Sequence, residues 1–138
     1  MVGKSDAGGA TRWQEGGNLS DASVAPWSQL GIARPGRDDS TLRVYYQDAG
    51  SYNIREIMYW DDGSSWSVSD LEIPQARLGS HLSAVSAKPP GDIRLYYQGT
   101  DNNLKEYFFT QQNRVWSPSK SCSPRSSSWA SLSNMSMG

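Results

Sequence analysis

The sequence predicts an all-β protein built from β-propeller blades, each a sheet of four short antiparallel strands. The first observation is an internal repeat: LRVYYQDAGSYNIREIMYWDDGSSW in residues 42–66 returns as IRLYYQGTDNNLKEYFFTQQNRVW in residues 93–116. The second is composition, with 6 Trp and 7 Tyr in short apolar runs that 13 Gly and 7 Pro help to separate. Self-similarity at a period of about 50 residues is typical of propeller blades.

Each repeat is expected to contain four strands, because runs of β-forming residues alternate with turn residues. No stretch places apolar residues at helical spacing over three turns, so helices are not expected. The expected strands are residues 29–33, 41–47, 54–60 and 65–69 in the first repeat and 82–86, 92–98, 104–110 and 115–118 in the second.

The two ends of the chain resemble parts of further blades. Residues 10–17 resemble the stretch around residues 63–70, which predicts an outer strand of a preceding blade. Near the other end, WASLSNM matches WSQLGIA of the first repeat, which predicts the inner strand of a following blade. The expected divisions are a partial strand and linker in residues 1–27, one blade in 28–79, a second in 80–127, and the start of a third in 128–138.

Two blades and two partial blades cannot close a ring, and a single blade cannot bury both of its faces. We therefore expect either that several copies assemble or that the chain is a piece of a longer propeller. An isolated monomer is expected to be unstable.

Charge and residue inventory weigh against several classes of function. The net charge is −1, with Lys and Arg scattered singly, which gives no footprint for nucleic acid. No apolar run approaches the roughly 20 residues that span a bilayer, so no membrane insertion is expected. The first 17 residues lack the apolar stretch of a secretory signal, which leaves the cytoplasm or unconventional export as expected locations. The single His81 and Cys122 predict no metal site, no cofactor and no His-based acid–base pair.

Alternation along the strands predicts that an arginine and a glutamate share a face in each repeat. Successive side chains of a strand point to opposite faces, so Arg43 lies on the face of Tyr45. If the second and third strands pair as a hairpin, Arg43 and Glu56 come side by side. Arg94 and Glu106 do the same in the second repeat.

The aromatic residues Tyr59 and Phe109 each follow the glutamate of their repeat by three positions and point to the other face. A cleft between consecutive blades would then carry Arg and Glu on one wall and an aromatic ring on the other. Planar donors and a carboxylate bind sugar hydroxyls through charge-assisted hydrogen bonds. The apolar C–H face of a sugar packs on an aromatic ring. The pattern predicts a sugar-binding cleft.

These residues resemble the fungal fucose-specific lectin family, whose motif is an apolar–Arg–Val–Tyr strand, a later Glu, an aromatic three residues on, and a closing Trp. Here the Arg-to-Glu spacing is 13 residues in the first repeat and 12 in the second. The resemblance covers residues 28–118 and implies a six-bladed propeller that binds L-fucose-containing glycans without transforming them. Short bacterial relatives carry two blades per chain and trimerise, so it also implies a homotrimer or a fragment of a longer propeller.

The resemblance implies one fucose site formed within the chain. Arg43 and Glu56 would hold oxygens of the sugar, and Phe109 and Trp116 of the next blade would stack on it. Phe109 departs from the family, which usually has Trp or Tyr at that position.

A second implied site would use Arg94 and Glu106. Its aromatic wall must come from a blade that the described repeats lack, and Tyr59 and Trp66 of another copy would supply it. Because Trp60 directly follows Tyr59, the sequence leaves open which of the two rings lines a cleft.

Both features also allow a purely structural interpretation. Arg43 and Glu56 would then form a cross-strand ion pair that contributes about 0.2–1 kcal/mol. Trp66 and Trp116 would fill space between blades. Recurrence at the same phase of the repeat favours the binding site over an isolated pair.

Two other classes of propeller match the sequence less well. Asp61–Trp66 resembles part of the Asp-box of sialidase-type glycoside hydrolases, but the second repeat lacks it and no Tyr–Glu nucleophile pair can be located. A protein-interaction propeller of the Trp–Asp repeat kind would carry Gly-His and Trp-Asp dipeptides in each repeat, and only the single Trp60-Asp61 is found here. We therefore expect a carbohydrate-binding protein and not an enzyme.

Overall fold

The computed structural model describes the backbone of residues 2–5 and 11–14 and the backbone and side chains of residues 16–19, 21–35, 41–60, 65–87 and 91–120. Ten strands and no helix occur in these ranges, so the expected all-β fold class is confirmed. No helix in the described part is long and apolar enough to cross a bilayer.

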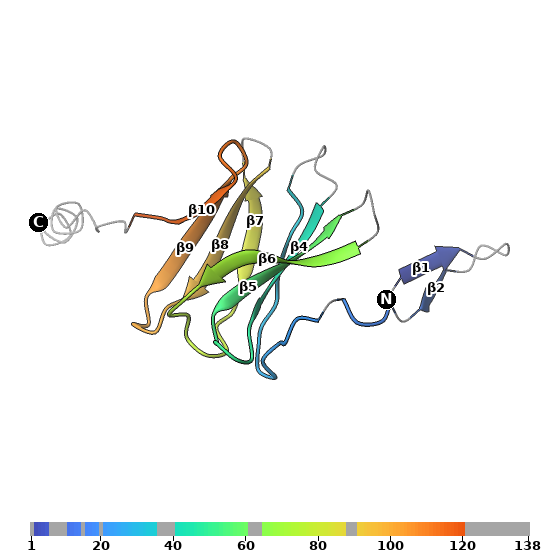
Figure 1. The fold of residues 1–138 in the computed structure, drawn as a ribbon, viewed down its shortest axis with the longest axis horizontal. Helices are drawn as coiled ribbons and strands as arrows, with labels where there is room; N and C mark the ends of the chain where they lie inside the picture. The colour runs from blue at the N-terminus through green and yellow to red at the C-terminus, as the bar shows by residue number, and fades with distance from the viewer. Residues whose placement is uncertain are drawn as a thin grey trace, which may run out of the picture.

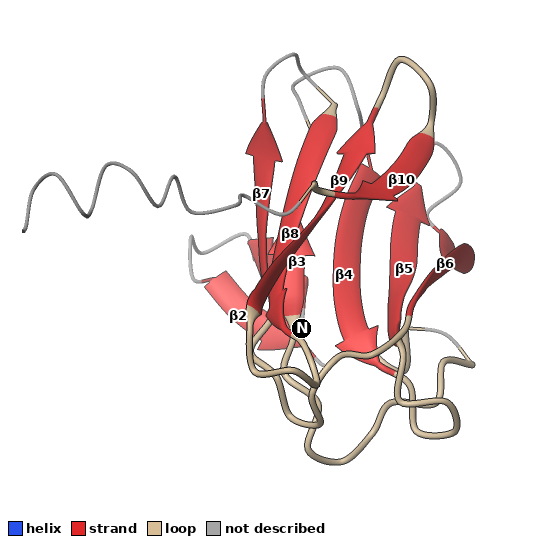
Figure 2. Ribbon diagram, turned by 90° about the vertical axis from the view of Figure 1, so that its left-hand side faces the viewer, coloured by secondary structure: helices blue, strands red, loops and turns tan. Residues whose placement is uncertain are grey.

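Two four-stranded antiparallel sheets form the body of the molecule and lie next to each other (Figure 1, Figure 2). In each sheet the strands follow one another in chain order, which is the up-and-down order of a propeller blade. The first blade contains β3 (Gly31–Ala33), β4 (Thr41–Gln47), β5 (Ile54–Trp60) and β6 (Ser65–Ile73). The second contains β7 (Ser83–Ala87), β8 (Asp92–Gln98), β9 (Leu104–Thr110) and β10 (Val115–Pro118).

The longest strand, β6, extends to Ile73, where the sequence predicted an end at residue 69. The cause is an irregularity in its pairing with β5: Ile57 pairs with Val68, but Arg55 pairs with Glu72. Residues 69–71 therefore lie opposite the single residue Glu56. An interrupted ladder hides the strand from a strict alternation pattern, and such bulges re-aim side chains.

At the N-terminal end, β1 (Val2–Ser5) and β2 (Thr11–Gln14) form a separate antiparallel pair. The sequence predicted one outer strand around residues 10–17, and the structure adds a partner strand to it. The expected inner strand of a third blade, in residues 128–138, and Cys122 lie outside the described residues.

The main core lies between the two blades. Tyr45, Ile54 and Ile73 of the first blade belong to the same buried cluster as residues of β8 and β9 in the second. A smaller cluster of Val44, Tyr46 and Ile57 occupies the other face of the first blade, with Trp66 packed against it. The side chains of β4 alternate between the two clusters, as the period of a strand requires.

The inner strands of the two blades approach closely at Gly31. A Cβ atom placed on Gly31 would lie 3.2 Å from the Leu82 Cβ atom and 3.3 Å from the Leu82 carbonyl oxygen. A larger residue would therefore push the blades apart.

A buried glutamine joins the first blade, on the side of the β4–β5 turn, to residues 74–82, the segment that leads from β6 into the second blade. The Gln47 side chain is fully buried, and its Nε2 atom donates to the carbonyl oxygens of Tyr52 at 3.3 Å and Arg77 at 3.1 Å. Its Oε1 atom accepts a hydrogen bond from the Gly79 backbone N–H at 2.9 Å. Among the described residues, the side chain of the equivalent Gln98 has one hydrogen-bond partner, the Asn102 carbonyl oxygen of its own turn, at 3.2 Å.

We predict that Gln47→Ala lowers the free energy of unfolding by about 1–3 kcal/mol, because backbone groups of the β4–β5 turn and of the segment between β6 and β7 lose their partner. Gln98→Ala is the matched control and should lower it by less than about 1 kcal/mol. Urea unfolding followed by Trp fluorescence measures both. Equal losses for the two variants would show that Gln47 does not link the first blade to this segment.

Candidate functional site

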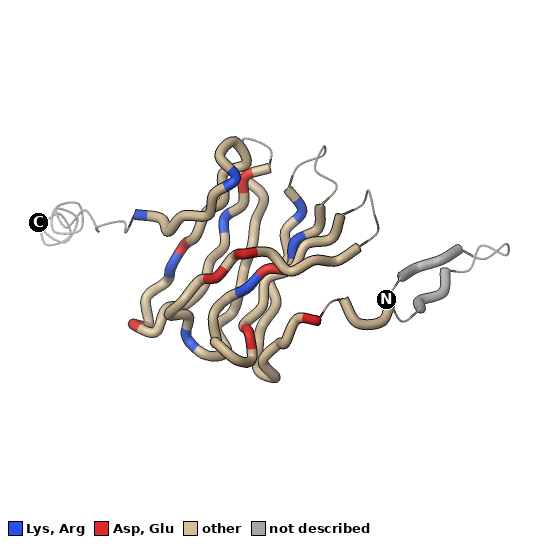
Figure 3. Tube along the Cα trace, viewed as in Figure 1, with Lys and Arg blue, Asp and Glu red and all other residues tan. Residues whose placement is uncertain are grey.

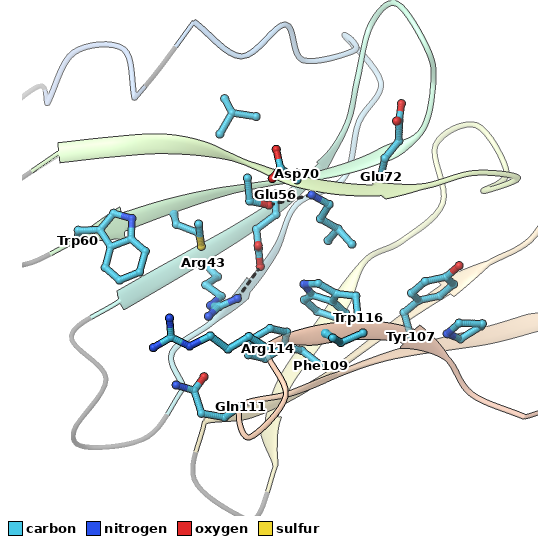
Figure 4. Close-up of a pocket in the computed structure, with 16 residues that line it drawn as sticks. Arg43, Glu56, Trp60, Asp70, Glu72, Tyr107, Phe109, Gln111, Arg114 and Trp116 are labelled. Atoms are coloured by element: carbon cyan, nitrogen blue, oxygen red, sulfur yellow. Dashed lines mark hydrogen bonds and ion pairs between the residues drawn. The ribbon is translucent and has the colours of Figure 1, made fainter.

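A cleft of about 1020 Å³ lies between the two blades. Strands β4, β5 and β6 form one wall, and β9, β10 and the turn between them form the other (Figure 4). Most of the residues that line it are charged or aromatic: Arg43, Glu56, Trp60, Asp70, Glu72, Tyr107, Phe109, Arg114 and Trp116, with the amide of Gln111 beside them.

On the first wall, Arg43 and Glu56 form a buried ion pair. Glu56 is paired across the strands with Tyr45, and Arg43 with Met58, so the charged residues are diagonal neighbours on one face. The Arg43 Nη1 atom donates to the Glu56 Oε2 atom at 3.3 Å (Figure 4). Only 8% and 2% of the two side chains are exposed. Burial of both charges is tolerated because each has the other as a partner.

The second blade supplies an aromatic wall. The Arg43 Cζ atom lies 4.5 Å from the centroid of the Phe109 ring, within the range of a cation–π interaction. Phe109 is the cross-strand partner of Trp116, and their ring centroids are 5.5 Å apart. Trp116 also meets Tyr45 edge-on at 5.7 Å. The structure thus brings together Arg43, Glu56, Phe109 and Trp116, the four residues of the first predicted site.

On the first wall, the buried Nε atom of Arg43 has no hydrogen-bond partner among the described residues, whereas the Tyr45 hydroxyl lies close enough to the Glu56 carboxylate to interact with it. Leaving a buried donor unsatisfied costs about 1–3 kcal/mol, so such atoms call for an explanation. Burial, and then the negative charge of Glu56, raises the pKa of Tyr45 well above its usual range. The Tyr45 hydroxyl therefore stays protonated and can act as a neutral donor.

The second predicted pair, Arg94 and Glu106, forms an ion pair of 2.8 Å on the outer face of the second blade. Here 48% and 20% of the side chains are exposed, since no further blade among the described residues lies against this face. The Ser119 hydroxyl, and next the Tyr96 hydroxyl, donate to Glu106 and lower the pKa of that carboxyl below its usual value. The Tyr96 pKa is correspondingly raised, first by this hydrogen bond.

Tyr59 and Trp66 lie on the face of the first blade that points away from the cleft. Their ring centroids are 5.2 Å apart, and Trp66 packs against the buried cluster on that face. Trp60 instead lines the cleft beside Arg43 (Figure 4). Within this chain, therefore, Arg94 and Glu106 do not meet Tyr59 and Trp66: the two pairs occupy opposite outer faces.

Several residues of the cleft were not predicted as site residues. Trp60 shares the strand face of Glu56, so alternation could have found it. Asp70 lies within the irregularly paired stretch of β6, and Arg114 lies in the β9–β10 turn with a positive φ of 52°. No periodic pattern signals residues in such places. Charged residues of both signs are interspersed along the strands of both blades (Figure 3).

Neighbouring blades of four antiparallel strands define the chain as part of a β-propeller. The model of the family described as "Fungal fucose-specific lectin" matches residues 8–135. The chain belongs to this family, whose members bind carbohydrate rather than catalyse its transformation. A comparison with curated protein sequences gave no match.

Comparison with solved structures also finds lectins. The six-bladed β-propeller lectin of Aleuria aurantia is 27% identical, with a TM-score of 0.57 over 72% of this chain and 30% of its own. A mutant of the same lectin in complex with Fucalpha1-6GlcNAc is 26% identical, with a TM-score of 0.55 over 74% of this chain and 31% of its own. A mutant of AofleA from Arthrobotrys oligospora is 27% identical, with a TM-score of 0.58 over 71% of this chain and 28% of its own. The chain therefore spans less than a third of the length of these relatives.

We predict that Ser119→Ala raises the pKa of Glu106 toward the ordinary value of 4.5, because its largest stabilising hydrogen bond is lost. A lowered pKa in the folded state means that the stability from this carboxylate is present above its unfolded pKa and is lost as pH falls through the folded pKa. An NMR titration of the Glu106 carboxyl measures the change. Ser86→Ala, on the distant β7, is the control, and an equal midpoint in all three proteins would contradict the assignment.

Proposed function

We propose that this protein is a lectin that binds L-fucose in the cleft between its two blades, without chemical change of the sugar. The observation that supports this most is the Arg43–Glu56 pair, which is buried against Phe109 and Trp116. Charged hydrogen-bonding groups face an aromatic wall across a cleft, as sugar recognition requires.

Each side chain has a distinct role in this proposal. Arg43 donates to sugar oxygens, and its unsatisfied Nε atom is a donor already desolvated and without a partner. Glu56 accepts from a sugar hydroxyl with the oxygen lone pairs that Arg43 leaves free. Phe109 and Trp116 pack against the C–H face and the methyl group of the sugar. Because Glu56 is engaged by Arg43, we assign it binding rather than proton transfer.

The relatives support fucose as the ligand. One mutant of the Aleuria aurantia lectin was solved with alpha-methyl-L-fucoside, and another structure holds Fucalpha1-6GlcNAc. In the Arthrobotrys oligospora relative, the mutant replaces three evenly spaced arginines with alanine. Arg43 and Arg94 of this chain are 51 residues apart, close to the 53-residue spacing of those three arginines.

We predict that Glu56→Gln reduces affinity for alpha-methyl-L-fucoside by at least about tenfold, because a hydrogen bond to a charged group contributes about 1.5–3 kcal/mol. Calorimetric titration measures the affinity, with methyl alpha-D-mannoside as the control sugar. The thermal midpoint of the variant shows whether it is folded. A folded variant that binds the fucoside as well as the parent would remove Glu56 from the site.

We infer a second fucose site at Arg94 and Glu106, completed by another blade. One outer face of the chain presents Arg94 and Glu106, and the opposite outer face presents Tyr59 and Trp66. When a second copy sets its Tyr59 face against the Arg94 face, the same combination arises as in the cleft within the chain. Three copies of two blades supply the six blades seen in the Aleuria aurantia lectin.

Assembly of several blades into one ring also raises the affinity for a glycan with several fucose residues. Sites on one ring act together on a multivalent glycan, and the effective concentration raises the overall affinity by 10²–10⁴. A following blade in a longer chain would complete the second site equally well. Either arrangement also covers the exposed face of the second blade that carries Arg94 and Glu106.

We predict that the chain forms a particle of about three copies that binds about two fucoside molecules per chain. Arg94→Ala should lower this to about one, because the cleft within the chain is untouched. Light scattering gives the mass and calorimetry gives the stoichiometry. A monomer with two sites per chain would refute completion by a second copy, whereas a monomer with one site would point to a following blade in a longer chain.

A further inference from the structure

The cleft is larger than one monosaccharide needs. Its volume of about 1020 Å³ is at the upper limit of the range for drug-sized ligands, roughly 300–1,000 Å³. The residues assigned to fucose occupy its centre, which leaves space at both ends. At one end in Figure 4 lie Trp60, Gln111 and Arg114, next to the guanidinium of Arg43.

These three residues offer the same chemistry as the proposed fucose site. The Arg114 side chain makes no hydrogen bond or ion pair with any part of the chain that the structure describes, so its donors are available. Gln111 adds an amide. The Trp60 side chain is 41% exposed, and its indole N–H donates to the Ser67 hydroxyl at 3.3 Å, which fixes the ring at the mouth of the cleft.

The turn that carries Gln111 and Arg114 is held in place. The Gln111 backbone N–H donates to the Asp92 Oδ1 atom at 2.8 Å. Gly91 has a φ of +97°, and a Cβ atom there would lie 2.7 Å from the Gln111 Cγ atom. Only glycine leaves room for the Gln111 side chain at this close approach. These contacts fix the backbone of the turn at Gln111, so the turn holds the bases of the Gln111 and Arg114 side chains at the edge of the cleft.

The three residues do not recur in the repeat. At a shift of 50 residues, Thr110 replaces Trp60, while Asp61 and Ser64 stand where the second repeat has Gln111 and Arg114. Arg, Glu and the closing Trp, in contrast, recur in both repeats. Because the shared residues define the common fucose site, these unshared ones distinguish the cleft within the chain from any site at Arg94.

We propose that Trp60, Gln111 and Arg114 form a subsite for the second sugar of a fucosylated glycan, present only in the cleft within the chain. Arg114 and Gln111 bind hydroxyls of that sugar, and the Trp60 ring packs on its C–H face. This inference rests on the proposed fucose site. It makes the two sites of the chain unequal, since the cleft within the chain binds a disaccharide and the site at Arg94 binds fucose alone.

The test uses the Arg94→Ala protein, in which only the cleft within the chain can bind. Its affinities for alpha-methyl-L-fucoside and for fucosyl disaccharides of each common linkage are measured by calorimetry. At least one disaccharide should bind about tenfold more tightly than the fucoside, a gain of ~1.4 kcal/mol. Adding Arg114→Ala or Trp60→Ala should bring that ratio down to about one. Arg34→Ala, which removes an exposed arginine away from the cleft, should leave the ratio at about ten.

The outcomes separate this inference from the proposal on which it rests. Fucoside binding with no gain for any disaccharide, or a gain that survives both Arg114→Ala and Trp60→Ala, overturns the second subsite alone. A folded protein that does not bind the fucoside overturns the fucose site, and the subsite with it. A gain that Arg114→Ala removes and Arg34→Ala leaves supports the subsite.

Discussion

The contact between neighbouring blades is the interaction on which the rest of this structure depends. One face of β4 and β5 buries Tyr45 and Ile54 in the shared core, and the same face carries Arg43 and Glu56. Blade contact thus removes apolar surface and an ion pair from water in a single step. The apolar burial stabilises the fold. The charged pair is costly to desolvate, which its mutual attraction and the Phe109 ring partly offset.

The two Arg–Glu pairs of the chain show what a neighbouring blade does. They occupy equivalent places in the repeat, yet the side chains of Arg43 and Glu56 are 8% and 2% exposed, and those of Arg94 and Glu106 are 48% and 20% exposed. The difference comes from the presence or absence of an aromatic wall. A site of the proposed kind is therefore complete only where two blades meet, so binding and blade assembly depend on the same surfaces.

Repeated and unrepeated residues have different places in the cleft. The repeated Arg, Glu and Trp come from regular parts of the strands, where alternation fixes the face of every side chain. The unrepeated Asp70 and Arg114 come from an irregular stretch of β6 and from a tight turn. Backbone irregularities of this kind aim side chains in directions that the regular sheet does not allow. The repeated residues therefore give each site the same centre, and the unrepeated residues give the cleft within the chain surroundings of its own.

The sequence by itself determined the all-β class, the two blades, the strand limits to within a few residues, and the shared face of Arg43 and Glu56. Strand periodicity is local, so it can be read from consecutive residues. Alternation places Trp60 on the face of Glu56 and Tyr59 on the other. Only the tertiary structure decided that the Trp60 ring lies in the same cleft as the β9–β10 turn, because the packing of one blade on the other forms that cleft. It also decided that Arg114 reaches the same cleft, since the position of a turn relative to another blade depends on contacts between residues far apart in the chain.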